Sequence, residues 1–412
     1  MLSKYVKTYE PSSITTISPG EVRPETVGLK QRDIDAIWQS VLGLYNTRLH
    51  PAISMCIRRH GQVVMDRAIG HAKGNAPGDG PRKRKVLATP DTLFNLFSAS
   101  KVVTAMLIHL LDERGLIHLD DPVSEYIPEF SRGSKRHITI RHILTHRAGI
   151  PNNPGHEDPL EVISNRDMLL KIICDAEPSL RPGRYIAYHA ITGGFILAEI
   201  IERVTGKDAR QFLRSEILNP LGFENFSYGV PSDLASSVAE HAYTGPPPAF
   251  PYSRLLERSL GFDIREAVKL SNEHRFLTSI VPSGNVIGTA NEACRFFELL
   301  LRQGTLDGTQ IFEPRTVRRA VAEQSYLELD GTLMLPVRYG MGFMLGGSYL
   351  SFYGFDTPQA FGHLGFTNVL AYADPERDIS VSFLNTGKPF ITLKLLRWLN
   401  VTRVISQRIP KC

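Results

Sequence analysis

Residues 89–130 read TPDTLFNLFSASKVVTAMLIHLLDERGLIHLDDPVSEYIPEF, and this stretch decides the fold. Within it, residues 98–114 predict a helix that ends at Gly115, because glycine readily takes the left-handed conformation found at helix C-termini. From Val102 to Leu111 this helix is apolar almost all round, which is typical of a helix buried at the centre of a protein. We therefore expect it to lie inside the molecule.

The sequence around this helix places strands near both ends of the chain and helices between them. Residues 52–69 predict two strands that turn at His60–Gly61. Further strand patterns lie at 339–353, 359–373 and 378–385. Helical spacing of apolar residues marks 31–47, 191–205, 291–303 and a C-terminal stretch, 394–411, that should pack on a sheet. These patterns predict an α+β fold: one antiparallel sheet built from both chain ends and flanked by helices, with an inserted, mostly helical region.

The same patterns divide the chain into an arm and two domains. Residues 1–30 are rich in Ser, Thr, Pro and Gly and predict an N-terminal arm. Residues 31–110 together with 282–412 should form an α/β domain, and residues 111–281 a mostly helical domain. Within the latter, residues 231–280 predict an insertion that could act as a lid. We expect its Pro-rich segment, Pro246–Tyr252, to line the substrate pocket.

Composition excludes several classes of protein. The chain has 412 residues, of which 42% are hydrophobic and 22% charged, and this excludes a collagen-like repeat and a disordered chain. The net charge of +5 is small for this length, and the basic run Arg82–Lys85 predicts a solvated loop, so no nucleic-acid partner is expected. The four cysteines are far apart and form no CxxC pair, so we expect no disulfide framework, metal or cofactor.

No targeting or membrane segment is expected either. The first residues, MLSKYVKTYEPSS, lack the apolar core of a secretory signal. Apolar runs fall far short of the ~20 residues of a transmembrane helix. These features predict a cytoplasmic protein without a membrane span.

Ser98 and Lys101 form an SxxK motif at the start of the buried helix. Residues i and i+3 share a helix face, so the lysine amine can reach the serine hydroxyl. A serine needs a neighbouring base to become a nucleophile, and a lysine can be that base once desolvation lowers its pKa. The helix start also directs free N–H groups toward a developing oxyanion.

An SxxK motif alone is weak evidence. A chain of this length contains about one by chance, and Ser98 could be a helix cap with Lys101 a surface lysine. A lysine in an otherwise buried helix argues for the catalytic reading, because burying an uncompensated charge is costly. The GxSxG, HExxH and GxxxxGK[ST] motifs of other enzyme classes are absent from the sequence.

From about residue 50 to 390 the chain resembles the serine β-lactamase-related family, which includes class C β-lactamases, D-alanyl-D-alanine peptidases and family VIII carboxylesterases. The 52–70 hairpin resembles the family's first two strands, and residues 89–130 its nucleophile segment. Further similar segments follow in the same order: ITIRHILTHRAGIP (138–151), PGRYIAYHAITGGFILAEIIERVTG (182–206), SGNVIGTANEACRFFELLLRQGTLDG (283–308), YGMGF (339–343) and FGHLGFTNVLAYADPE (361–376).

The resemblance implies a role for each of these site residues. Ser98 would be the nucleophile, Lys101 the base for acylation, and Tyr188 the phenol that passes protons to the leaving group and activates the deacylating water. The backbone N–H groups of Ser98 and Phe366 would form the oxyanion hole. His363, Leu364 and Gly365 would flank the substrate. Tyr188 as an ordinary buried tyrosine and His363 as a structural strand histidine stay open as alternatives.

Two departures from the family pattern bear on the substrate. The Y-x-N motif of the β-lactamases and peptidases is Tyr188-His189-Ala190 here, so the amide that can bind a substrate carbonyl is missing. The third motif starts with His363 where those enzymes have lysine, and histidine is mostly neutral at pH 7. Both changes weaken recognition of anionic amide substrates, whereas a neutral ester needs neither group.

The sequence therefore predicts a carboxylesterase, a serine hydrolase for small or short-acyl esters, with a small-molecule ester as its partner. A β-lactamase or D-alanyl-D-alanine carboxypeptidase is the main alternative. An acyltransferase on the same scaffold and a non-catalytic protein are the others. Acyl-chain preference, stereochemistry and oligomeric state have no signal in the sequence.

Overall fold

The computed structural model describes residues 4–152, 158–247, 250, 252–261, 263–390 and 396–412. Its main sheet has ten strands, in the order β1-β3-β2-β16-β15-β14-β13-β12-β11, with β4 paired to β3, and all pairs are antiparallel. The strands are β1 (Thr15–Ile17), β2 (Ala52–Arg59), β3 (Gln62–Lys73), β4 (Val86–Leu87), β11 (Ser325–Leu329), β12 (Pro336–Tyr339), β13 (Met344–Leu345), β14 (Phe361–Leu364), β15 (Leu370–Asp374) and β16 (Ile379–Asn385). The predicted α+β fold, with its sheet built from both chain ends, is confirmed.

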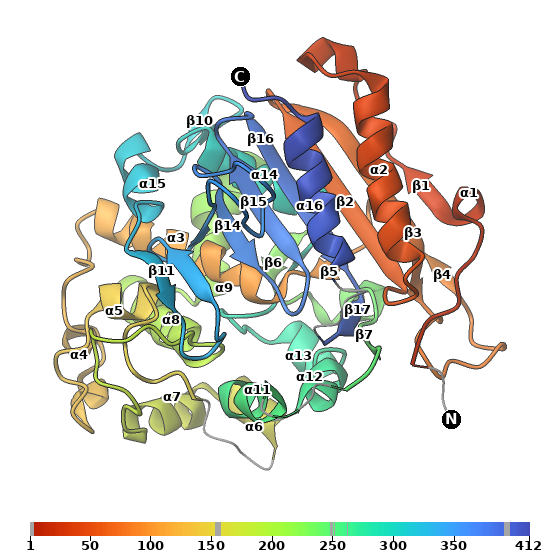
Figure 1. Cartoon of the computed structure of the whole chain (residues 1–412). Helices are drawn as coiled ribbons and strands as arrows, with labels where there is room; N and C mark the ends of the chain where they lie inside the picture. The colour runs from red at the N-terminus through yellow and green to blue at the C-terminus, as the bar shows by residue number, and fades with distance from the viewer. Residues whose placement is uncertain (1–3, 153–157, 248–249, 251, 262, 391–395) are drawn as a thin grey trace.

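Helices cover both faces of this sheet (Figure 1). On one face lie α2 (Gln31–Tyr45) and α16 (Arg397–Arg408). Helix α16 packs on the sheet, as expected for the C-terminal stretch, and it also contacts α2. On the other face lie α14 (Ala290–Leu301) and α3 (Ser100–Glu113). Strand β2 shows the alternation that this sandwich requires: Ile53, Met55 and Ile57 belong to the cluster around α2 and α16, whereas Ala52 and Cys56 belong to the cluster around α3.

Most of the remaining elements lie on the α3 side of the sheet, whereas α1 packs near β3 and contributes Ile14 to the cluster around α2. The other helices are α1 (Pro11–Ile14), α4 (Val123–Tyr126), α5 (Ile140–Leu144), α6 (Pro159–Ser164), α7 (Arg166–Asp175), α8 (Thr192–Thr205), α9 (Ala209–Leu213), α10 (Asn219–Leu221), α11 (Tyr252–Leu260), α12 (Ile264–Leu270), α13 (His274–Thr278) and α15 (Pro314–Ala320). Small sheets join β5 (Phe94–Asn95), β8 (Val286–Gly288) and β6 (Phe226–Tyr228), then β7 (Ala242–Thr244) and β17 (Gly387–Pro389), and β9 (Thr305–Leu306) and β10 (Thr309–Gln310).

Several predicted boundaries differ from the structure. Residues 339–353 do not form one strand, because the chain turns at Gly340–Phe343 between β12 and β13, and Gly342 takes a left-handed φ of 92° there. Residues 359–373 form two strands with a turn between them. Helix α3 starts at Ser100, and Ser98 lies in the 3-10 turn Phe97–Ala99 before it. The 231–280 insertion contains helices and one strand, and part of its Pro246–Tyr252 segment lies outside the described residues.

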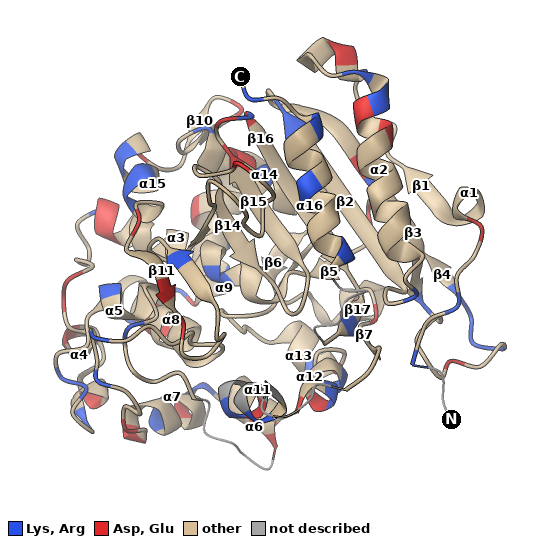
Figure 2. Cartoon of the chain, in the orientation of Figure 1, with Lys and Arg blue, Asp and Glu red and all other residues tan. Residues whose placement is uncertain are grey.

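Charged residues are spread over the outer helices and loops (Figure 2). Helix α2 carries both signs. In the basic run before β4, Lys83 pairs with Asp79 and Glu240, so part of its charge is neutralised locally. Across the described ranges, no helix combines the length and apolar character needed to cross a bilayer.

Candidate active site

Ser98 lies in a tight turn between β5 and α3, and its side chain is partly buried. The residue before it, Phe97, has a left-handed φ of 48°, an uncommon conformation for a residue other than glycine. Its amide N–H donates to Asn95 Oδ1 at 2.8 Å, which stabilises this conformation. The Phe97 ring contacts His241 and Phe366, with centroid distances of 4.7 and 5.3 Å. The turn is thus stabilised by the hydrogen bond to the Asn95 side chain and by the packing of the Phe97 ring.

Lys101 lies one turn further along and is 8% exposed. Its Nζ lies 3.2 Å from Ser98 Oγ, 2.8 Å from the Ala190 carbonyl and 3.0 Å from the Ser283 carbonyl. Burial lowers the pKa of Lys101 to about 7. A neutral amine has two N–H donors and one lone pair, which matches two carbonyl acceptors and one hydroxyl. The two carbonyls therefore orient the lone pair toward Ser98.

Tyr188 lies in the segment before α8, and its phenol is near enough to Ser98 for the two side chains to interact. Burial raises the pKa of this phenol, and the interaction with Ser98 opposes the shift. The Lys101 amine lies over the Tyr188 ring, 4.9 Å from its centroid. Tyr188 is thus a neutral phenol at neutral pH, able to donate a proton, and it contacts both members of the SxxK pair.

Three buried histidines, His146, His189 and His363, lie near the Tyr188 phenol. The His146 ring lies 4.7 Å and the His363 ring 5.9 Å from the Tyr188 ring, and the backbone N–H of His189 donates to His146 Nδ1. Burial lowers the pKa of His189 and of His363 to about 3 and that of His146 well below its usual value, with the nearby Lys101 charge as a further cause. All three are neutral imidazoles at physiological pH, so they shape the site without adding charge.

His363 and Leu364 end strand β14, and Gly365 and Phe366 begin the turn to β15. A Cβ on Gly365 would lie 2.4 Å from the carbonyl oxygen of Leu96. Gly365 is therefore needed for close packing between this turn and the Ser98 turn, whatever its place beside the substrate. The contact brings the residues from 361–366 next to Ser98.

The structure thus brings together Ser98, Lys101, Tyr188 and His363, and it packs Gly365 and Phe366 against the Ser98 turn. Sequence reasoning missed the backbone carbonyls of Ala190 and Ser283, because any residue can supply a carbonyl. Ser283 lies in a segment that the resemblance had marked without giving it a role. The Ser283 hydroxyl accepts the Gly194 N–H. A Cβ on Gly194 would lie 2.2 Å from this hydroxyl oxygen, so a glycine at position 194 helps to place the Ser283 carbonyl.

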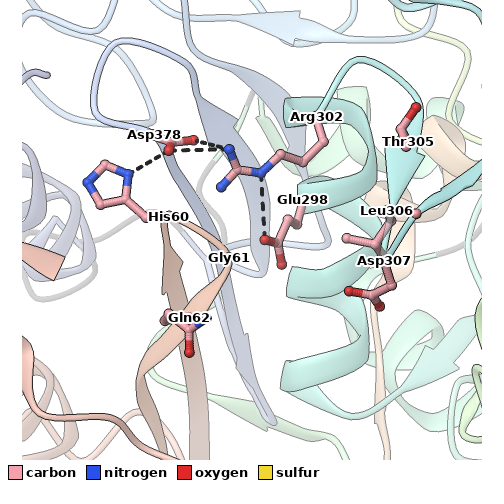
Figure 3. A pocket seen from close by; sticks show the side chains of 10 residues that line it. His60, Gly61, Gln62, Glu298, Arg302, Thr305, Leu306, Asp307 and Asp378 are labelled. Atoms are coloured by element: carbon pink, nitrogen blue, oxygen red, sulfur yellow. Dashed lines mark hydrogen bonds and ion pairs between the residues drawn. The ribbon is translucent and has the colours of Figure 1, made fainter. Parts of the chain in front are cut away.

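A pocket of about 400 Å³ is lined by none of these residues (Figure 3). It is formed where the β2–β3 turn, the β9–β10 turn and the end of α14 meet. Its charged groups bind one another: Asp378 contacts His60 at 2.6 Å and Arg302 at 3.3 Å, and Arg302 lies 3.9 Å from Glu298. These contacts link the β2–β3 and β15–β16 turns of the sheet to the end of α14. Among the described residues, no group of three or more His, Cys, Asp or Glu is placed to hold a metal ion.

Comparison with known proteins identifies the family of the chain. The sequence description of the beta-lactamase family matches residues 38–403. The chain belongs to the beta-lactamase family. It is 26% identical over 308 residues to the esterase/beta-lactamase LipL of Mycobacterium tuberculosis, covering 70% of this chain and 68% of LipL.

Two solved structures of similar fold extend over most of the chain. A penicillin-binding protein homologue from Caulobacter crescentus has a TM-score of 0.78 at 26% identity, covering 92% of this chain and 99% of the homologue. A family VIII carboxylesterase has a TM-score of 0.76 at 23% identity, covering 91% of this chain and 98% of that structure. The chain is thus a serine hydrolase of the beta-lactamase family with esterase homologues, as its motifs predicted.

Proposed function

We propose that this beta-lactamase family member is a carboxylesterase that cleaves small or short-acyl esters through an acyl-enzyme on Ser98. The observation that carries the proposal is the environment of Lys101. Two backbone carbonyls occupy the N–H donors of a neutral amine and leave its lone pair facing Ser98 Oγ at 3.2 Å. This is the arrangement that a general base needs before it can activate a serine.

In acylation, Lys101 accepts the Ser98 proton while Oγ attacks the ester carbonyl carbon. The negative charge that develops on the carbonyl oxygen is stabilised by the backbone N–H groups of Ser98 and Phe366. When the tetrahedral intermediate collapses, the bond to the alcohol oxygen breaks, and this oxygen takes a proton from Tyr188. The phenol recovers a proton from the Lys101 ammonium, whose Nζ lies over the Tyr188 ring.

In deacylation, a water molecule attacks the acyl carbon and gives its proton to the Tyr188–Lys101 pair. The bond between the acyl carbon and Ser98 Oγ then breaks, Oγ regains a proton, and the carboxylic acid leaves. The net reaction is ester plus water to acid plus alcohol. No charge is left on the enzyme after a complete cycle.

The choice of an ester over a β-lactam or peptide rests on two residues. His363 is buried and neutral, and its Nδ1 lies 2.7 Å from the Leu364 carbonyl, so it supplies no cation to a substrate carboxylate. Ala190 has no side-chain amide, and its carbonyl oxygen accepts the Lys101 N–H. The name of LipL, an esterase/beta-lactamase, supports the ester assignment and keeps β-lactam cleavage as the second candidate.

The test compares p-nitrophenyl butyrate with nitrocefin. We expect rapid ester turnover and little nitrocefin turnover by the unmodified chain. Ser98→Ala should abolish ester turnover and labelling by a fluorophosphonate, whereas Ser131→Ala, which changes an exposed serine in another part of the chain, should leave both intact. Ester turnover that survives in Ser98→Ala would disprove the mechanism. Cleavage of nitrocefin without cleavage of the ester would establish the second candidate.

A further inference from the structure

Asp330 is a fully buried carboxylate at the tip of the β11–β12 hairpin. Its Oδ1 accepts three backbone N–H groups, from Tyr188 at 3.1 Å, Thr332 at 2.8 Å and Leu333 at 2.9 Å. Its Oδ2 accepts the Tyr339 hydroxyl at 2.9 Å. Four hydrogen bonds to its two oxygens fix the position of the Asp330 carboxyl group.

The hairpin tip holds the Tyr188 segment at more than one point. Besides the bond from Tyr188, the Gly331 N–H donates to the Ile186 carbonyl at 2.9 Å, and the Leu333 side chain packs against the cluster that contains Ile186 and Tyr188. On the opposite side, the Ala187 N–H donates to the His146 carbonyl at 3.0 Å. The backbone of Tyr188 is therefore clamped between the hairpin and the loop after α5.

We propose that Asp330 is a positioning residue that holds the Tyr188 phenol beside Ser98 and Lys101. The inference rests on the proposed function, in which Tyr188 gives a proton to the departing alcohol. Tyr188 lies in a segment without regular secondary structure, so its side chain has no helix or strand to orient it. A bond to the amide of the same residue, from a carboxylate 142 positions further along the chain, supplies that orientation.

The dependence on leaving group separates this role from a general structural one. A p-nitrophenolate leaves without a proton at neutral pH, whereas an alkoxide needs one. Misplacement of Tyr188 should therefore lower kcat/KM, which reports acylation, far more for ethyl butyrate than for p-nitrophenyl butyrate. A protein that is merely less stable loses activity on both esters by the same factor.

The variants are Asp330→Ala, Asp330→Asn and, as the reference, Tyr188→Phe. We expect Asp330→Ala to lower kcat/KM about 100-fold for ethyl butyrate and less than 10-fold for p-nitrophenyl butyrate, with the same selectivity as Tyr188→Phe. Asp330→Asn keeps one oxygen as acceptor for the three amides and replaces the other oxygen with an NH2 group. It should therefore lower kcat/KM less than Asp330→Ala, and again more for ethyl butyrate than for p-nitrophenyl butyrate. Asp374→Asn is the matched control, because Asp374 is also a buried carboxylate, ion-paired to Arg377 at 2.7 Å. It should lower stability and change both esters equally.

An equal loss on both esters, or an Asp330→Asn variant indistinguishable from the unmodified chain, would overturn the positioning role. If Asp330→Ala does not fold, the Asn variant decides by the same criterion. Failure of the proposed function looks different, because the unmodified chain would then hydrolyse neither ester. In that case a crystal structure of Asp330→Asn decides: a Tyr188 hydroxyl displaced from Ser98 supports the role, and an unmoved one rejects it.

Discussion

Replacing Lys101 with methionine tests the central electrostatic feature of the site, a buried lysine that has no carboxylate partner among the described residues. The pKa of this amine is about 7 in the folded chain, against an ordinary value of 10.5. Between these values the unfolded chain holds a proton that the folded chain lacks. Raising the pH over this range therefore stabilises the folded chain, and lowering it destabilises the folded chain.

The size of the effect follows from the two pKa values. At pH 7 the proton imbalance destabilises the folded chain by about 4 kcal/mol, and at pH 9 by about 2 kcal/mol. Methionine has a similar length and does not titrate, so Lys101→Met removes this dependence. Its loss of the bonds to Ala190 and Ser283 is the same at both pH values. From pH 7 to pH 9, the free energy of unfolding of the unmodified chain should therefore rise by about 2 kcal/mol relative to that of the variant.

Urea unfolding of both proteins at pH 7, 8 and 9 measures this difference, because titrations common to the two proteins cancel. The histidines near Lys101 do not interfere, since burial holds their pKa values far below this range. The same ionisation should appear as the acid limb of kcat/KM, with activity rising as the pH passes about 7. Parallel stability curves for the two proteins between pH 7 and pH 9 would refute the assignment of a lowered pKa to Lys101.

Two glycines supply further predictions. Gly365→Ala places a Cβ 2.4 Å from the Leu96 carbonyl oxygen and should push the β14–β15 turn away from Ser98. We expect kcat/KM to fall about 100-fold in a steady-state ester assay. Activity within twofold of the unmodified chain would contradict this prediction. Gly342→Ala places a Cβ 2.2 Å from that of Ala105 at a left-handed φ, and should cost about 3 kcal/mol in urea unfolding. The control is Gly43→Ala in α2, where the new methyl meets nothing within 4 Å. This change should stabilise the folded chain by up to ~1 kcal/mol. Similar urea midpoints for the two variants would contradict the packing argument.

Features that depend on local spacing were predictable from the sequence. Ser98 and Lys101 are three residues apart, and the 3-10 turn that leads into α3 keeps their side chains together at that spacing. The strands at both chain ends were also predictable, because apolar alternation is a local signal. The strand predicted over 339–353 was wrong, because the conformation of Gly342 follows from its close contact with α3, which no local pattern reveals.

Asp330 could not be predicted for a related reason. Its neighbours in the sequence, Leu329 and Gly331, indicate only a turn between two strands, and nothing near Tyr188 indicates a distant acceptor for its backbone N–H. Such a contact depends on how the hairpin packs after the chain has folded. The carbonyls that bind Lys101 are similar, since their position is set by the packing of α8 against α3 and not by residue type.

The pairing of β2 with β16 has a consequence for the order of folding. Residues 53–59 pair with residues 379–385, so one of the inner strands of the sheet is completed by chain made more than 300 residues later. During synthesis, β2 and β3 can form their hairpin early, but the β2 edge stays open until β16 leaves the ribosome. Such long-range pairing slows folding, because a large loop must close before the contacts can form. An incomplete chain that lacks its last 40 residues presents an unpaired, apolar strand edge, and this makes truncated or slowly translated forms prone to aggregate.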